Sequence, residues 1–207
     1  QVVSLITQVI VDETDPAFEQ PSKPVGPFLS KEEAESEMER SQAVFKEDSG
    51  RGWRKVVPSP KPISINEHIV INQLVENGVI PITVGGGGIP VVKKDNELRG
   101  IEAVIDKDFA SQKLAELIQA DLLVVLTGVN NIYINYNQPN QKQLNEVTVT
   151  EMKGYIAEHQ FAVGSMLPKV EAAIAFVENS KNGKAIVTSL ENIEYVLTEG
   201  AGTIITK

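Results

Sequence analysis

The chain lacks cysteine altogether and has only two histidines, His68 and His159. Without cysteine there is neither a disulfide nor a thiolate metal ligand, and this fits a reducing compartment. The two histidines stand far apart, which gives little support to a histidine-based metal site or a Ser-His-Asp triad. No apolar run approaches the roughly 20 residues that a membrane-spanning helix needs. These absences favour a cytoplasmic protein with no membrane partner.

Positive charge is also scarce. The 207 residues contain 19 Lys and Arg against 28 Asp and Glu, with a formal net charge of -9 at pH 7 and a pI near 4.8. A polyanion would be repelled overall, which argues against a nucleic-acid partner but leaves room for a local basic pocket that binds a small phosphate. The chain opens without Met, directly in a strand-like run. We therefore expect residues upstream of Gln1 in the natural protein.

The first 62 residues change character after a single strand. Residues 1–11 are rich in β-branched side chains and are typical of a buried strand. Seven of the eleven prolines then fall between Pro16 and Pro62. Within that stretch we expect a short helix over 30–40 with a capping box, and a hairpin that pairs 43–45 with 53–57 across residues 48–50. We interpret 12–62 as an inserted subdomain or lid; an irregular surface excursion is the alternative.

From residue 63 onward, strands and helices alternate. We expect helices over 65–76, 107–119, 150–158 and 167–179, and strands over 79–84, 91–92, 101–105, 122–127, 132–136, 184–188 and 203–206. Asp106 is placed to cap the helix that begins at 107. Such alternation predicts a three-layer α/β/α sandwich with an open, mainly parallel sheet. Its main domain would span 63–207, with residues 1–11 adding a strand.

Four consecutive glycines, Gly85, Gly86, Gly87 and Gly88, follow an apolar strand. Glycine lets backbone N–H groups approach an anion closely, and successive N–H groups can form an anion nest. The run is not a P-loop, because no Gly-Lys-Ser/Thr follows, and Pro90 weakens a dinucleotide fingerprint. The preceding strand excludes a flexible linker. Binding of a phosphate or carboxylate and a structural turn both remain open.

Two lysines occupy first turns of expected helices. A cation there opposes the helix dipole, so an anion should compensate it at Lys107 and at Lys169. A phosphoryl group is one candidate; for Lys107 the flanking aspartates, including Asp108, are another. Each lysine alone is more typical of a solvated surface, but the pair favours a shared anion.

Two further features are ambiguous from sequence alone. Thr127, Gly128 and Val129 end the most apolar strand and would suit the wall of a site for a planar group, or simply a turn. Lys23 lies in a proline-stiffened loop that would deliver it to a fixed point, although an exposed linker lysine is the simpler interpretation.

Several stretches together resemble the carbamate kinases, which belong to the amino-acid kinase superfamily. They are PSKPVGPF (21–28), FKEDSGRGWRKVVPSPKP (45–62), GGGGIPVV (85–92), EAVIDKDFAS (102–111), LTGV (126–129) and GSMLPKVEAAI (164–174). The resemblance covers nearly the whole chain in the family's order. The second stretch is long and unusual enough to separate it from acetylglutamate, aspartate and uridylate kinases.

The resemblance implies reversible phosphoryl transfer between carbamoyl phosphate and MgADP, a cytoplasmic homodimer, and a role in arginine or agmatine catabolism. It implies that Lys107 and Lys169 neutralise the transferring phosphoryl group, that Asp108 organises them, and that Lys23 reaches the carbamoyl phosphate side. Gly85 to Gly88 would bring N–H groups to the substrate, and Mg²⁺ would be held mainly by nucleotide phosphates rather than by protein ligands. The residues implied to line the nucleotide pocket are Thr127, Gly128, Val129, Tyr136, Met166, Leu167, Pro168 and Lys169.

One departure from the family matters. Family members begin with an Ala-Leu-Gly-Gly-Asn-Ala-type loop and later carry a Ser-His-Gly-Asn-Gly-Pro-Gln-Val-Gly-type loop, and neither occurs here. The chain resembles roughly the last two-thirds of the family's length, so we expect the 207 residues alone to lack turnover. A non-catalytic nucleotide- or metabolite-binding paralogue and a related kinase acting on an amino-acid carboxylate are the alternatives.

Overall fold

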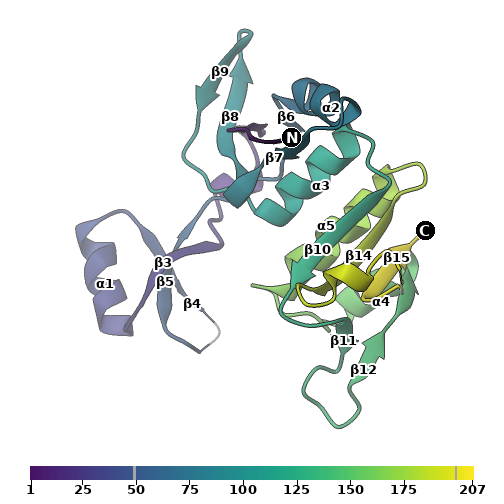
Figure 1. Ribbon diagram of the computed structural model, residues 1–207. Helices are drawn as coiled ribbons and strands as arrows, with labels where there is room; N and C mark the ends of the chain where they lie inside the picture. Colours follow the sequence, from purple (N-terminus) through teal and green to yellow (C-terminus); the bar gives the residue numbers. More distant parts are fainter. Residues whose placement is uncertain (49, 199) are drawn as a thin grey trace. The chain divides into compact units, whose positions relative to one another are not determined.

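The computed structural model describes residues 1–48, 50–198 and 200–207. They divide into two compact units. The first unit comprises Gln1–Glu67 and Asn77–Ala110, and the second comprises His68–Glu76 and Ser111–Lys207. Strands and helices occur in both units (Figure 1), which confirms the predicted α/β class. None of the helices in the described part of the chain is long and apolar enough to cross a membrane.

The predicted strand over residues 1–11 is two strands. β1 (Val2–Ser4) pairs in parallel with β7 (Ile80–Ile82), whereas β2 (Gln8–Ile10) pairs in parallel with β8 (Ile89–Lys94). The chain changes partner between them: the Leu5 N–H donates to the Ile82 carbonyl, and the Ile89 N–H donates to the Thr7 carbonyl. The expectation of one continuous strand was wrong because the segment that pairs with these residues is itself interrupted: it leaves β7, turns through the glycines and then starts β8.

A four-stranded mixed sheet completes this part of the first unit, in the order β6-β2-β8-β9. β6 (Ser64–Ile65) is antiparallel to β2, and β9 (Glu97–Gly100) forms a hairpin with β8. Asp95 and Asn96 make the turn with φ of 51° and 63°, the left-handed conformation that two-residue hairpin turns require. The strand predicted over 101–105 is absent, because the hairpin's second strand lies earlier, directly after that turn.

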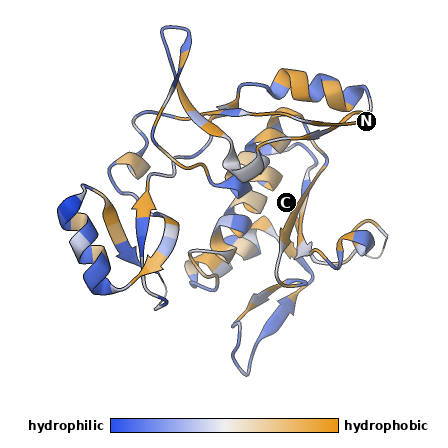
Figure 2. Ribbon diagram, turned by 60° about the vertical axis from the view of Figure 1, so that its left-hand side comes forward, coloured by the Kyte–Doolittle hydropathy of each residue, from blue (hydrophilic) through white to orange (hydrophobic). Residues whose placement is uncertain are grey.

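The segment over residues 12–62 carries its own antiparallel sheet, in the order β3-β5-β4. Its strands are β3 (Lys23–Leu29), β4 (Val44–Glu47) and β5 (Trp53–Val57), and the 3₁₀ turn η1 (Pro16–Phe18) precedes β3. α1 (Lys31–Arg40) connects β3 to β4, and its capping box at Ser30 and Glu33 is formed as predicted. Figure 2 shows α1 as mostly hydrophilic. The predicted pairing of β4 with β5 is confirmed, although the turn at residues 48–50 includes Ser49, which lies outside the described residues.

The second unit is built on a sheet in the order β10-β14-β15-β13. β10 (Leu122–Thr127) and β14 (Lys184–Ser189) are parallel, β15 (Thr203–Thr206) is antiparallel to β14, and β13 (Glu146–Thr148) is parallel to β15. This sheet is therefore mixed, like the sheet β6-β2-β8-β9. β10 is apolar from Leu122 to Leu126, and β14 is buried from Ala185 to Ser189, as expected for strands in the interior of a sheet.

Helices pack on this sheet and supply about half of the buried residues of its core. α5 (Met166–Asn179) packs on β10, β14 and β15 and against α4 (Val149–Ala157), and its buried residues include Val170, Phe176 and Val177. The remaining elements of this unit are α2 (His68–Glu76), β11 (Ile132–Ile134), β12 (Lys142–Leu144) and η3 (Ile193–Tyr195). α3 (Lys107–Leu117) begins in the first unit and ends in the second.

Candidate functional site

The four glycines fall into two pairs with different surroundings. They follow Val84, whose φ is 46°, and η2 (Gly85–Gly87) forms a 3₁₀ turn. A Cβ on Gly87 would lie 2.1 Å from the Ile105 carbonyl oxygen, and one on Gly88 would lie 2.7 Å from Val9 Cγ2. Both have positive φ, 115° and 86°. The fold itself therefore requires glycine at 87 and 88.

The other two glycines face open space. A Cβ on Gly85 or Gly86 would meet nothing within 4 Å, and only Gly86, at 69°, has positive φ. Gly85 lines a cavity of about 430 Å³ together with Ser4, Leu5, Ile6, Thr7, Ile82, Gly88 and Ile89. Packing gives no reason for glycine at 85. A ligand that approaches the backbone would give one.

The same glycine turn touches the residues that begin α3. Because Gly87 packs on the backbone of Ile105, the turn lies beside the sequence Asp106-Lys107-Asp108. Asp106 caps α3 as predicted: its Oδ1 accepts the Asp108 N–H at 2.9 Å, and its carbonyl accepts the Ala110 N–H at 3.0 Å. Lys107 is exposed, with Nζ 3.9 Å from Asp108 Oδ2.

Lys23 reaches the same place from β3. The sequence placed it in a loop, but it begins a strand and pairs in register with Val57 of β5. Its Nζ donates a hydrogen bond to Asp106 Oδ2 and forms an ion pair there. The simpler interpretation of Lys23 as an exposed linker lysine is thus wrong. The first unit brings Lys23, the glycine turn and the start of α3 together.

Asp106 is the residue of this group that sequence reasoning treated only as a helix cap. It is buried, with 7% of its surface exposed. Burial raises the pKa of its carboxyl group, but the hydrogen bonds from Lys23 and the Asp108 N–H, with the charges of Lys23 and Lys107, outweigh burial and hold the pKa below its ordinary value. Asp106 is therefore an anion that faces a lysine 83 residues earlier in the chain.

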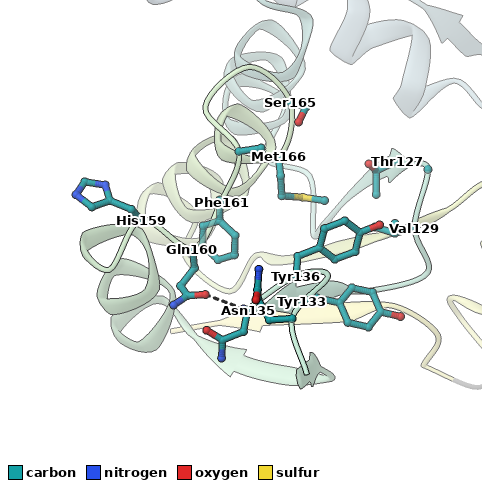
Figure 3. Close-up of a pocket in the computed structure, with 13 residues that line it drawn as sticks. Thr127, Val129, Tyr133, Asn135, Tyr136, His159, Gln160, Phe161, Ser165 and Met166 are labelled. Carbon is teal, nitrogen blue, oxygen red and sulfur yellow. Dashed lines mark hydrogen bonds between the residues drawn. The ribbon is translucent and has the colours of Figure 1, made fainter. Parts of the chain in front are cut away.

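The second unit holds a separate cavity of about 510 Å³ (Figure 3). Five residues of the expected nucleotide pocket line it: Thr127, Gly128, Val129, Tyr136 and Met166. Leu167, Pro168 and Lys169 continue α5 after Met166 but are not among the lining residues. Lys169 lies in the first turn of α5, as predicted, and in the other unit from Lys107.

Sequence reasoning missed most of the other walls of this cavity. They come from β11, from the segment after it and from the segment after α4: Tyr133, Asn135, Gln138, His159, Gln160, Phe161, Ala162 and Ser165. The rings of Tyr133 and Tyr136 lie 6.0 Å apart, and Gln160 Oε1 accepts the Asn135 N–H at 2.7 Å, which ties the two segments together. His159 points away from the aromatic side chains in Figure 3. Tyr133, within β11, and Tyr136, just after it, were the signal in the sequence.

Carboxylates and histidines are spread out. Within residues 1–48, 50–198 and 200–207, no three His, Asp or Glu side chains gather into a group that would hold a metal ion.

Comparisons with known proteins identify the family of the chain. The amino acid kinase family matches residues 13–189. The chain belongs to the amino acid kinase family. Among curated relatives of the chain, a carbamate kinase of Oenococcus oeni is 60% identical over 205 residues, which cover 99% of the chain and 65% of the relative.

Solved structures of the same family have a similar fold. Carbamate kinase from Giardia lamblia bound to citric acid is 41% identical with a TM-score of 0.91, and the same enzyme bound to AMP-PNP is 42% identical with a TM-score of 0.87. Each comparison covers 100% of this chain and 65% of the other. The chain thus spans about 65% of the length of these relatives.

Proposed function

We propose that this chain is part of a carbamate kinase, which transfers a phosphoryl group reversibly between carbamoyl phosphate and ADP. A β-phosphate oxygen of ADP attacks the phosphorus atom of carbamoyl phosphate, the bond from phosphorus to the carbamoyl oxygen breaks, and ATP and carbamate form. The observation that carries the proposal is the group in the first unit, where Lys23 pairs with Asp106 at the start of α3, next to Lys107 and to the glycine turn. The similarity of the chain to carbamate kinases supports the proposal.

This chemistry asks the protein mainly for position and charge. In phosphoryl transfer, electrostatic stabilisation of the phosphoryl oxygens dominates, and little covalent work remains for side chains. Lys107 and Lys169 would neutralise those oxygens, and Asp108 would orient the lysines. Lys23 would reach the carbamoyl phosphate, while the N–H groups of Gly85 to Gly88 would bind its oxygens. The chain's shortage of histidine and its lack of cysteine are compatible with such a mechanism.

The cavity in the second unit would take the nucleotide. Aromatic and apolar walls suit the flat face of a base, and the residues that follow Met166 on α5 would lead toward its phosphates. Magnesium would arrive with ADP or ATP, held mainly by the phosphate oxygens, and would supply positive charge to the reaction. The AMP-PNP complex of the Giardia enzyme supports a nucleotide site in this family.

Further features of the proposal come from the resemblance. The protein would be a cytoplasmic homodimer that forms ATP at the end of arginine or agmatine breakdown, with no nucleic-acid or membrane partner. Residues 12–62 would form a lid inserted between a strand in 1–11 and the main domain over 63–207, and would carry Lys23 to the substrate.

A substrate panel tests the function. ADP is incubated with Mg²⁺ and a protein of the relatives' length that carries this chain, and ATP is measured with carbamoyl phosphate as donor. For comparison, phosphoryl transfer from ATP to acetylglutamate, glutamate or uridylate is measured. We expect carbamoyl phosphate to be preferred. Preference for another substrate would assign a related kinase, and nucleotide binding without turnover would assign a non-catalytic paralogue; either result contradicts the proposal. The same assay on the 207 residues tests the prediction that they lack turnover.

A further inference from the structure

The charged groups at the start of α3 balance one another. Lys23 and Lys107 carry positive charges, and Asp106 and Asp108 carry negative ones. The four formal charges sum to zero, from two positive and two negative. An incoming phosphoryl group would therefore meet lysines that already have carboxylate neighbours.

The two lysines differ in how firmly they are held. Asp106 is tied at both oxygens: Oδ1 accepts the Asp108 N–H, and Oδ2 accepts from Lys23. The Asp106 side chain is 10% exposed and that of Lys23 is 32% exposed. The contact between Lys107 and Asp108 is long, 3.9 Å, and the Lys107 side chain is 63% exposed. Lys23 is held, whereas Lys107 extends into solvent.

From this difference we propose that Asp106 is a positioning residue that holds Lys23 beside the glycine turn at the start of α3. A lysine side chain has four rotatable bonds and gains no directional preference of its own. β3 delivers the backbone of Lys23 by its register with β5, and Asp106, fixed by its helix cap, then selects the position of the ammonium group. Helix capping and lysine positioning are thus separate tasks of two oxygens on one carboxylate.

The two tasks can be separated by one substitution. Asparagine caps helices about as well as aspartate, so Asp106→Asn keeps an oxygen for the Asp108 N–H and loses the charge that faces Lys23. Asp12→Asn is a matched control in the same unit. Asp12 Oδ1 likewise accepts the N–H two residues on, from Thr14 at 2.8 Å, and its carboxylate is bonded by Thr14 rather than by a lysine.

Chemical labelling of amines tests the position of Lys23 without any enzyme activity. The chain is acetylated briefly with an N-hydroxysuccinimide ester, and labelling of Lys23 relative to Lys31 is measured by peptide mass spectrometry. Lys31 is an internal standard because its side chain is 62% exposed and its contact with Glu35 is long, 3.8 Å. We expect Asp106→Asn to raise the ratio about fivefold, since a hydrogen bond to a charged group is among the stronger ones. Asp12→Asn should leave the ratio unchanged.

The role in catalysis rests on the proposed function, and a double-mutant cycle tests it. In the longer protein we expect Asp106→Asn and Lys23→Met each to lower kcat while the KM for ADP stays unchanged, and the double variant to resemble Lys23→Met alone. Additive losses would overturn the positioning role. An unchanged labelling ratio in Asp106→Asn would overturn it too, whatever the activity. A raised ratio in a protein with no turnover would instead leave the pairing in place and contradict the proposed function.

Discussion

The two compact units offer surfaces of different chemistry. In the first unit, the candidate site consists of charged side chains and bare backbone: Lys23, Asp106, Lys107 and the open glycines at 85 and 86. In the second unit, the cavity is walled by Tyr133, Tyr136, Phe161 and Met166. A phosphoryl group is recognised by charge and N–H donors, whereas a planar base is recognised by aromatic surface. Under the proposed function, each unit would bind a different part of the reacting pair.

The largest expected effect concerns Lys107. Lys107→Met should lower kcat by about 10²–10³-fold, the usual loss when one group that stabilises transition-state charge is removed. ADP affinity should stay unchanged, because the aromatic cavity is untouched. Steady-state kinetics and calorimetric ADP titration check both parts. Lys31→Met, on the exposed face of α1, is the control and should behave as wild type. A Lys107→Met protein with normal kcat would remove Lys107 from the mechanism.

The glycine turn gives the next largest effect. Gly87→Ala should lower the free energy of unfolding by roughly 2–4 kcal/mol, because the new methyl group would strike the Ile105 carbonyl at positive φ. Gly85→Ala should change it by less than about 0.5 kcal/mol, since its methyl group enters open space. Urea denaturation measures both.

The same pair of variants sharpens the assignment of the site. Although Gly85→Ala should fold normally, its methyl group would project where a ligand meets the backbone, and we expect a higher KM for carbamoyl phosphate. If the two variants lose equal stability, the division of the glycines into structural and ligand-facing pairs is wrong.

Tyr136 tests the aromatic cavity. Tyr136→Ala should weaken ADP binding about tenfold, in line with the loss of one stacking side chain, and should leave the KM for carbamoyl phosphate unchanged. Tyr195→Ala is a suitable control, because Tyr195 has similar exposure, 46% against 52%, and is not among the residues that line the cavity. Equal ADP affinity in both variants would mean that the base binds elsewhere.

The smallest effect is the pH dependence of Asp106. Its pKa is lower in the folded protein than the ordinary value of about 3.9, so the ionised group stabilises the fold above that value, and this stabilisation is lost as pH falls through the folded pKa. The difference in unfolding free energy between wild type and Asp106→Asn should therefore be constant from about pH 5 to 8, at roughly 1–2 kcal/mol, and shrink below about pH 4. A difference that grows on acidification would contradict this sign.

Local patterns in the sequence predicted local structure well. The capping box at Ser30, the cap at Asp106, and the strands over 122–127 and 203–206 all depend on side chains within a few residues of one another. The split of residues 1–11 into β1 and β2 depends instead on Thr7, whose Oγ1 accepts the N–H of Val84, 77 residues away. No local pattern carries that information.

In the candidate site, too, residues with a locally unusual pattern were predicted, and residues that act through long-range contacts were not. The sequence singled out Lys107 and Lys169 because a lysine in a first helical turn is locally unfavourable, and the glycine run because it is locally unusual. It left Asp106 as a cap, since the contact with Lys23 joins residues 83 apart. It also missed Tyr133 and Gln160, whose role in the cavity arises from the packing of two loops.

The most direct test of this account is to map the two ligands separately on the labelled 207-residue chain by NMR. ADP should shift signals of Tyr136, Met166 and their neighbours in the second-unit cavity, whereas inorganic phosphate, as a probe for the phosphoryl group, should shift those of Gly85, Gly86 and Lys107. Two separate sets of shifted signals are the expected result. Shifts by both ligands in one and the same set of residues would contradict the division of recognition between the units.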